Sequence, residues 1–293
     1  MFAVVGVSGQ VGGAVARSLL AKQLPVRAVV RDRHKGAAWA ERGCEPAVAD
    51  LRDGDALTAA FRGAEGVFVM LPAVFDPLPG FPETRQVLAA LRPALAAARP
   101  GRVVALSSIG AQAARSSLIA QLGLLEAALE DLPIPVAYLR PGWFLENAAW
   151  DVDAARTGAI TSFLQPLDKP VPMVATDDVG RVAASLLQET FSGRRVVELE
   201  GPERVSPYQL AETFAALLHR PVRVDALPRE RWAATFAAQG MKNPAPRIEM
   251  LHGFNQGWLA FEGGEASIQR GEIGLRTALA RLIARAGAVD PGA

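Results

Sequence analysis

The stretch that decides the fold is Phe2-Ala-Val-Val-Gly6-Val-Ser8-Gly9-Gln10-Val-Gly12-Gly13, followed by the Ala- and Leu-rich run 14–20. It predicts an apolar strand, a turn with glycines at 6, 9 and 12, and a helix. Such a turn lets a pyrophosphate approach the backbone at the partly positive helix start, and the last glycine lets helix and strand pack closely. A glycine triplet alone often marks only a tight turn, but one between a strand and a helix is typical of a dinucleotide site. The residues expected to bind the cofactor here are Gly6, Val7, Ser8, Gly9, Gln10, Val11 and Gly12.

The composition bounds the class of protein. Half of the 293 residues are hydrophobic, which is ample for a buried core. Lys and Arg total 31 against 30 acidic residues, so no basic field favours nucleic acid or a membrane surface. No stretch approaches the roughly 18 apolar residues of a membrane span. We expect no direct nucleic-acid binding and no membrane association, and the oligomeric state stays open, a homodimer included.

Cysteine and histidine usage narrows the class further. The single cysteine, Cys44, cannot form an internal disulfide, which suits a reducing cytoplasm, and we expect a structural thiol. The three histidines have no neighbours at metal-ligand spacing. The sequence therefore predicts a cytoplasmic protein without a metal site.

A second strand, predicted over 25–30, ends in the basic cluster Arg31-Asp-Arg33-His34-Lys35. An acidic residue at this strand end would bind a ribose 2′-hydroxyl, whereas a basic cluster suits a 2′-phosphate. We expect Arg31 to contact that phosphate and NADP(H) to be favoured over NAD(H). A solvated charged loop is the alternative, because Asp32 lies inside the cluster.

Further strands predicted at 45–49, 66–72, 102–106 and 136–140 alternate with helices at 37–43, 55–61, 83–98 and 118–131. This alternation predicts an α/β Rossmann fold, a doubly wound parallel sheet with helices on both faces. Strand ends should face the crevice beside the glycine turn. The spacing fits a helix cap at Asp50 equally well, and Ser107 can simply close its turn. The cofactor contacts expected at the strand ends are Asp50, Leu51, Met70, Leu71, Pro72 and Ser107.

The pattern loosens after Asn147. We expect residues 1–150 to form the NAD(P)-binding domain and 151–293 mostly a small C-terminal substrate lobe. A helix and strand at about 176–201 should return to the sheet, with 160–172 irregular. Asp177 and Asp178 are interpreted as helix caps, because adjacent residues on a helix point in different directions.

Several of these motifs together resemble the NmrA-like branch of the atypical short-chain dehydrogenases/reductases. The matching pieces include Gly6-Val-Ser-Gly9-Gln-Val-Gly12, Ser107-Ser-Ile-Gly110-Ala, Leu139-Arg-Pro-Gly142-Trp-Phe-Leu-Glu146-Asn147 and Thr176-Asp-Asp178-Val-Gly-Arg. The resemblance implies a pyrophosphate loop at 6–12, a 2′-phosphate contact at Arg31 and a segment at 141–147 beside nicotinamide. The residues of that segment expected at the cofactor are Pro141, Gly142, Trp143, Phe144 and Asn147.

One departure from the wider group matters for function. Typical short-chain dehydrogenases carry Tyr-x-x-x-Lys on the helix after the Ser-Ser strand, where the tyrosine donates the proton. Residues 118–126 here read Leu-Ile-Ala-Gln-Leu-Gly-Leu-Leu-Glu. Interconversion of alcohols and ketones through that acid is therefore disfavoured.

Two functions fit these observations. The resemblance extends to quinone oxidoreductases and to azo and triphenylmethane dye reductases, whose electron-poor acceptors take hydride from NADPH with little acid assistance. The alternative is a regulatory protein that senses NADP(H) without turnover and binds a protein partner. If the protein is an enzyme, we expect an aromatic or quinone-like small molecule to bind in an apolar slot. Packing alone explains the aromatic side chains expected to line this slot equally well. The slot residues are Phe75, Trp143, Phe144 and Trp150.

Overall fold

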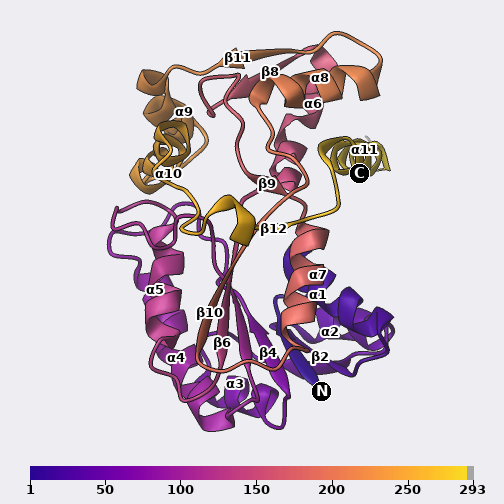
Figure 1. The fold of residues 1–293 in the computed structure, drawn as a ribbon, viewed down its shortest axis with the longest axis vertical. Coiled ribbons are helices and arrows are strands. Elements are labelled where there is room, and N and C mark those ends of the chain that lie inside the picture. The colour runs from indigo at the N-terminus through magenta and orange to yellow at the C-terminus, as the bar shows by residue number, and fades with distance from the viewer. Residues whose placement is uncertain (289–293) are drawn as a thin grey trace.

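The computed structural model describes residues 1–288. Its larger part is built on one eight-stranded sheet, which lies in the lower half of Figure 1. The strand order is β12-β10-β6-β5-β4-β1-β2-β3, and every pairing is parallel. The direction of winding reverses between β1 and β4, where doubly wound sheets open a crevice. The predicted Rossmann fold is confirmed. The strands are β1 (Phe2–Val5), β2 (Val26–Val30), β3 (Glu45–Val48), β4 (Gly66–Val69), β5 (Val103–Leu106), β6 (Val136–Pro141), β10 (Arg194–Glu200) and β12 (Gln269–Arg270).

Helices cover both faces of the sheet, because alternate residues of each strand point to opposite sides. In β1, Phe2 and Val4 join the core under α1 and α7, while Ala3 and Val5 join the core under α3, α4 and α5. Cys44 is buried in the first of these cores, as expected for a structural thiol. The helices of these layers are α1 (Gln10–Ala21), α2 (Arg33–Ala40), α3 (Gly54–Phe61), α4 (Pro82–Ala98), α5 (Ala120–Leu129) and α7 (Thr176–Leu186).

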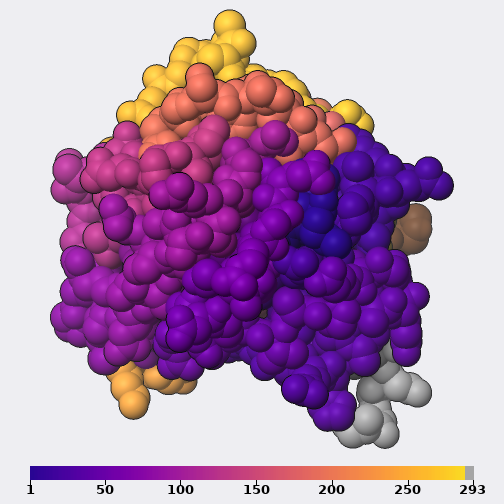
Figure 2. Space-filling view, turned by 90° about the horizontal axis from the view of Figure 1, so that it is seen from below, coloured from indigo at the N-terminus to yellow at the C-terminus, as the bar shows by residue number. Residues whose placement is uncertain are grey.

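The lobe lies above the carboxyl ends of the strands (Figure 1). Its core gathers large side chains such as Phe214, Trp232 and Phe236, which are fully buried. Seen from below in Figure 2, the molecule is dominated by the indigo and purple N-terminal segment, and the yellow C-terminal segment reaches only the rim. The lobe elements are β7 (Trp143–Phe144), η1 (Leu145–Asp151), α6 (Val152–Thr157), β8 (Ala159–Ser162), β9 (Met173–Val174), α8 (Pro207–Leu218), β11 (Arg223–Ala226), η2 (Arg229–Arg231), α9 (Trp232–Ala238), α10 (Ala245–Gln256), η3 (Glu265–Ser267) and α11 (Leu275–Ala288).

Two expectations for the chain beyond residue 150 are wrong. Residues 160–162 are not irregular, because β8 pairs in parallel with β11, a partner some sixty residues further along the chain. Asp177 and Asp178 do not cap α7, which begins at Thr176 with no side-chain cap. Instead Asp178, only 1% exposed, accepts the backbone N–H groups of residues 272 and 273 at 2.9 and 2.8 Å. Its carboxylate therefore secures the segment that leads into α11.

Close contact between α1 and α7 ties the returning helix to the glycine turn. A Cβ placed on Gly180 would lie 2.3 Å from Ala14 Cβ, so only glycine allows this approach. None of the helices within residues 1–288 is long and apolar enough to cross a bilayer.

Candidate active site

The glycine turn has the backbone that the sequence predicted for it. Gly6 has φ +73°, and a Cβ there would meet Met70 Sδ at 2.7 Å. A Cβ on Gly12 would lie 2.3 Å from the Gly6 carbonyl oxygen, so α1 can pack on the turn only because this residue is glycine. Gly9 is the N-cap residue of α1, and no side chain caps this helix. The first hydrogen bond within the helix runs from the Gly13 N–H to the Gly9 carbonyl oxygen, at 3.0 Å. The amides of residues 10–12 therefore point out of the helix as donors for an anion.

A crevice of about 480 Å³ opens beside this turn, between the ends of β1, β2 and β4. Its walls combine two basic and two acidic side chains with main chain and apolar surface, a mixture that suits a nucleotide. The structure thus brings together residues that the sequence placed in separate strands. The predicted residues that line this crevice are Gly6, Ser8, Gly9, Arg31, Asp50, Leu51, Met70, Leu71 and Pro72.

The charges at the end of the crevice favour an additional phosphate. Asp32 is the N-cap of α2, and its carboxylate accepts a hydrogen bond from the His34 N–H at 2.8 Å. The negative charge of Asp32 is therefore directed at the start of the helix. Asp50 does not cap α3, a task that Asp53 performs. It pairs with Arg52 at 3.0 Å, and this hydrogen bond, aided by the charge of Arg31, lowers the Asp50 pKa. Arg52 is a second cation of the crevice; it was not predicted, although it directly follows Leu51, which was.

An apolar hollow of about 250 Å³ adjoins the crevice, and residues 70–74 line both. Its walls are the segments that follow β4, β5 and β6, closed by Met250 and Phe254 of α10. The 141–144 segment is part of it, where a Cβ on Gly142 would lie 2.5 Å from the Pro172 oxygen. The predicted residues brought together here are Met70, Leu71, Pro72, Phe75, Ser107, Pro141, Gly142, Trp143, Phe144, Asn147 and Trp150.

The aromatic residues of the hollow do more than pack. Phe75 and Trp150 remain 46% and 63% exposed and meet edge to face with their ring centres 6.2 Å apart. Trp143 makes a similar contact with Phe254 at 5.3 Å. Core aromatics in this protein, such as Trp232, are fully buried. Exposed rings at the rim of an apolar hollow are the arrangement expected for binding a flat ligand.

Ser107 lines the hollow, but its hydroxyl donates to Glu126. Glu126 in turn accepts two hydrogen bonds from Arg140, at 2.8 and 2.6 Å, and Arg140 also bonds Glu262. Burial alone would lower the pKa of Arg140, but its carboxylate partners outweigh burial and raise that pKa. This ion cluster holds the end of β5, the helix α5 and the segment before β12 together. The Ser107 hydroxyl is therefore a structural donor and not an acid for catalysis.

Neither tyrosine of the chain, both of which lie within residues 1–288, lines the hollow. The chain has two, and the Tyr138 hydroxyl bonds the Glu126 carbonyl oxygen at 3.0 Å, while burial raises its pKa. Tyr208 lies half exposed on α8. In the helix that carries the tyrosine of typical short-chain dehydrogenases, Gln121 faces the hollow and accepts a hydrogen bond from Thr84 at 2.8 Å. Among residues 1–288 no cluster of metal-ligating side chains occurs.

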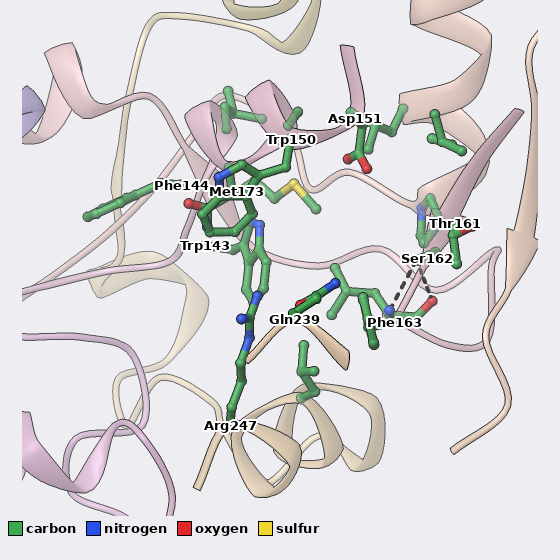
Figure 3. Close-up of a pocket in the computed structure, with 18 residues that line it drawn as sticks. Trp143, Phe144, Trp150, Asp151, Thr161, Ser162, Phe163, Met173, Gln239 and Arg247 are labelled. Atoms are coloured by element: carbon green, nitrogen blue, oxygen red, sulfur yellow. Dashed lines mark hydrogen bonds between the residues drawn. The ribbon is translucent and has the colours of Figure 1, made fainter. Parts of the chain in front are cut away.

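A third cavity of about 500 Å³ enters the lobe beyond the hollow (Figure 3). The two share Trp143, Phe144, Asn147, Trp150 and Arg247. Its wall mixes apolar with polar side chains, and one of the polar side chains is Asp151, whose pKa burial raises to about 6. Neither Asp151 nor Arg247 stands in a sequence motif, so neither was predicted.

The parallel sheet, the glycine turn and the lobe over the strand ends define a Rossmann-fold protein with its cleft between sheet and lobe. The model of the NmrA-like family matches residues 1–247. The chain belongs to the NmrA-like family, which confirms the resemblance noted in its sequence. Its relatives include an NAD(P)H azoreductase from Xenophilus azovorans. The two sequences are 30% identical over 243 residues, a stretch that covers 82% of this chain and 82% of the azoreductase.

Solved structures give the same picture. An NADPH-dependent quinone oxidoreductase from Escherichia coli superposes with a TM-score of 0.77 at 25% identity, covering 96% of this chain and 99% of that one. The triphenylmethane reductase of Citrobacter sp. superposes with a TM-score of 0.79 at 19% identity, covering 97% of this chain and 99% of that one. The similarity to the quinone oxidoreductase supports a common ancestry, and the similarity to the triphenylmethane reductase shows that the fold is shared.

Proposed function

We propose that this protein is an NADPH-dependent reductase that transfers hydride to an electron-poor planar acceptor of the quinone, azo or triphenylmethane dye type. The observation that carries the proposal is that the crevice at the glycine turn adjoins an apolar hollow rimmed by exposed aromatic rings. The azoreductase and quinone oxidoreductase relatives support the same chemistry. In this proposal residues 1–150 bind the dinucleotide, and the lobe completes the acceptor site.

The residues of the crevice suit the cofactor. NADPH, when bound, supplies the hydride. The turn from Gly6 to Gly12 and the free amides of α1 would hold the pyrophosphate. Arg31 and Arg52 would meet the 2′-phosphate, which favours NADP(H) over NAD(H). The segment 141–147 would lie beside the nicotinamide.

The hollow would orient the acceptor and exclude water. Trp143, Phe144, Phe75 and Trp150 offer flat apolar surface, and a ring held between them reacts without the cost of finding its orientation. Among residues 1–288 no tyrosine or lysine lines the hollow, and the Ser107 hydroxyl already donates to Glu126. Quinones and azo compounds accept hydride together with a proton that water can supply, and cationic triphenylmethane dyes accept hydride without any proton, so these acceptors fit a site of this composition.

A second function, NADP(H) sensing without turnover, is favoured by the same lack of an acid. In this case cofactor occupancy would alter binding to a protein partner. The sensor would bind NADPH tightly and leave it unoxidised with every acceptor.

The test is NADPH oxidation, followed by absorbance, with a panel of quinones, azo dyes and triphenylmethane dyes. We expect saturable oxidation, and we expect Trp143→Ala to impair it. Tyr208→Ala is the matched control, because this aromatic residue is half exposed outside the hollow. Tight NADPH binding with no oxidation above the protein-free rate would refute the reductase and favour the sensor.

A further inference from the structure

We propose that Arg247 is the anion-recognising residue of the acceptor site, and that the protein's acceptor is an aromatic compound with a carboxylate, sulfonate or phosphate substituent. This inference rests on the proposed function and specifies its substrate class. Arg247 extends from the first turn of α10 to the junction where the hollow meets the lobe cavity, and it lines both (Figure 3).

The guanidinium of Arg247 has no carboxylate partner among residues 1–288, although acids lie around it. Asp76 accepts the backbone N–H groups of residues 242 and 243, at 2.9 and 2.6 Å. Glu249, two residues further along α10, pairs with Arg229 at 3.2 Å. Asp151 lines the same lobe cavity but lies beyond ion-pair distance, across the cavity in Figure 3. The charge of Arg247 is therefore not neutralised by the protein.

The position of this cation is unfavourable in the free protein. Burial lowers the Arg247 pKa, because the charged form is partly removed from water. The residue also stands at the positive end of α10, whose first turn contains no acidic side chain. A methionine or leucine would fill the same space without either cost. The aromatic rings beside the guanidinium offset only part of these costs, and the remainder points to a ligand that neutralises the charge.

Aromatic rings hold the guanidinium in place. Its central carbon lies 4.6 Å from the ring centre of Phe236, 5.7 Å from Trp150 and 5.9 Å from Phe75. Its one polar contact in the described chain is with Met241 Sδ at 3.8 Å. The rings restrict the side chain and leave its N–H donors for a ligand, which is how a planar fork binds an oxyanion with two parallel hydrogen bonds.

The position of Arg247 also limits the shape of the acceptor. A flat ring in the hollow would place its edge at the junction, so that an anionic substituent on that edge meets Arg247. Deeper in the lobe cavity, Asp151 is ionised above pH about 6 and repels a second anion. The site therefore favours an aromatic acceptor with a single anionic group near the reacting ring.

Binding of an unreactive pair of probes tests the inference without turnover. We expect naphthalenesulfonate to bind the wild-type protein, in excess NADP⁺, at least about tenfold more tightly than the neutral naphthalenesulfonamide, as measured by titration calorimetry. Arg247→Met should abolish this preference, and Arg247→Lys should retain part of it. Arg115→Met is the matched control, because Arg115 also covers a ring, that of Trp258 at 5.0 Å, but lines neither cavity.

Equal affinity of the wild-type protein for the two probes would overturn the inference, and so would an unchanged preference in both Arg247 variants. The reductase proposal is tested separately, by kcat/KM for naphthoquinone and naphthoquinone sulfonate. Arg247→Met should lower kcat/KM for the sulfonate alone, by about tenfold. Turnover of neither quinone would count against the reductase, while the calorimetric comparison would still decide the role of Arg247.

Discussion

The buried carboxylate of Asp151 destabilises the folded protein, and replacing it with a neutral side chain measures the free-energy cost of this charge in the lobe cavity. Burial raises the pKa of its carboxyl from 3.8 to about 6, and no residue of the described chain forms a hydrogen bond with that carboxyl. At 1.36 kcal/mol per pH unit, this difference corresponds to about 3 kcal/mol between the charged and neutral forms. We expect Asp151→Asn, which stays neutral, to raise the free energy of unfolding by at most that amount at about pH 8.

The pH dependence gives the sign of this effect. The folded-state pKa of Asp151 is higher than its unfolded value, so the unfolded chain loses the proton first as the pH rises from about 4. Wild-type stability therefore falls between about pH 4 and pH 6 and stays lower above that range. The advantage of Asp151→Asn should shrink to about half at about pH 5, as measured by urea unfolding at several pH values.

Asp153→Asn is the control for this experiment. Asp153 lies two residues further along the chain, but its side chain is 91% exposed and forms an ion pair with Arg156 at 3.1 Å. Its substitution should change stability little at any pH. A stability difference for Asp151→Asn that does not vary with pH, or one no larger than that of Asp153→Asn, would refute the reasoning.

Three further predictions concern the crevice and the ion cluster. Gly12→Ala forces a Cβ against the Gly6 oxygen and should weaken NADPH binding at least about tenfold by fluorescence titration; unchanged affinity would mean that α1 can shift. Arg31→Ala should move the ratio of NADPH to NADH dissociation constants about tenfold toward NADH, whereas an equal loss for both would place Arg31 away from the 2′-phosphate. Arg140→Met leaves Glu126 buried without its partner and should cost about 3–5 kcal/mol in urea unfolding; a cost below about 1 kcal/mol would show that water replaces the guanidinium.

The sequence predicted those parts of the fold that depend on local pattern. Strands β1 to β6 and the glycine turn are visible because apolar runs and glycine spacing occur within a few residues of each other. The short strand β12 was not predicted, since two residues carry no periodicity and their pairing with β10 depends on the tertiary fold. The same holds for β8 and its distant partner β11.

The candidate site was predictable to a similar extent. Residues at strand ends could be placed together, because parallel strands end at one edge of a sheet. The engagement of Ser107 by Glu126 could not be foreseen, since the two lie on separate elements. Arg247 is one arginine among many in the sequence, and only the packing of α10 against the hollow shows that its charge has no partner.

The route of the chain through the lobe has a consequence for synthesis on the ribosome. Strand β6 is complete at residue 141, but its outer neighbour β10 begins at residue 194 and the edge strand β12 at residue 269. Until those residues leave the ribosome, a nascent N-terminal half exposes an unpaired and apolar strand edge that can pair with another chain. We expect fragments that end near residue 150 to aggregate, although they contain the whole glycine turn.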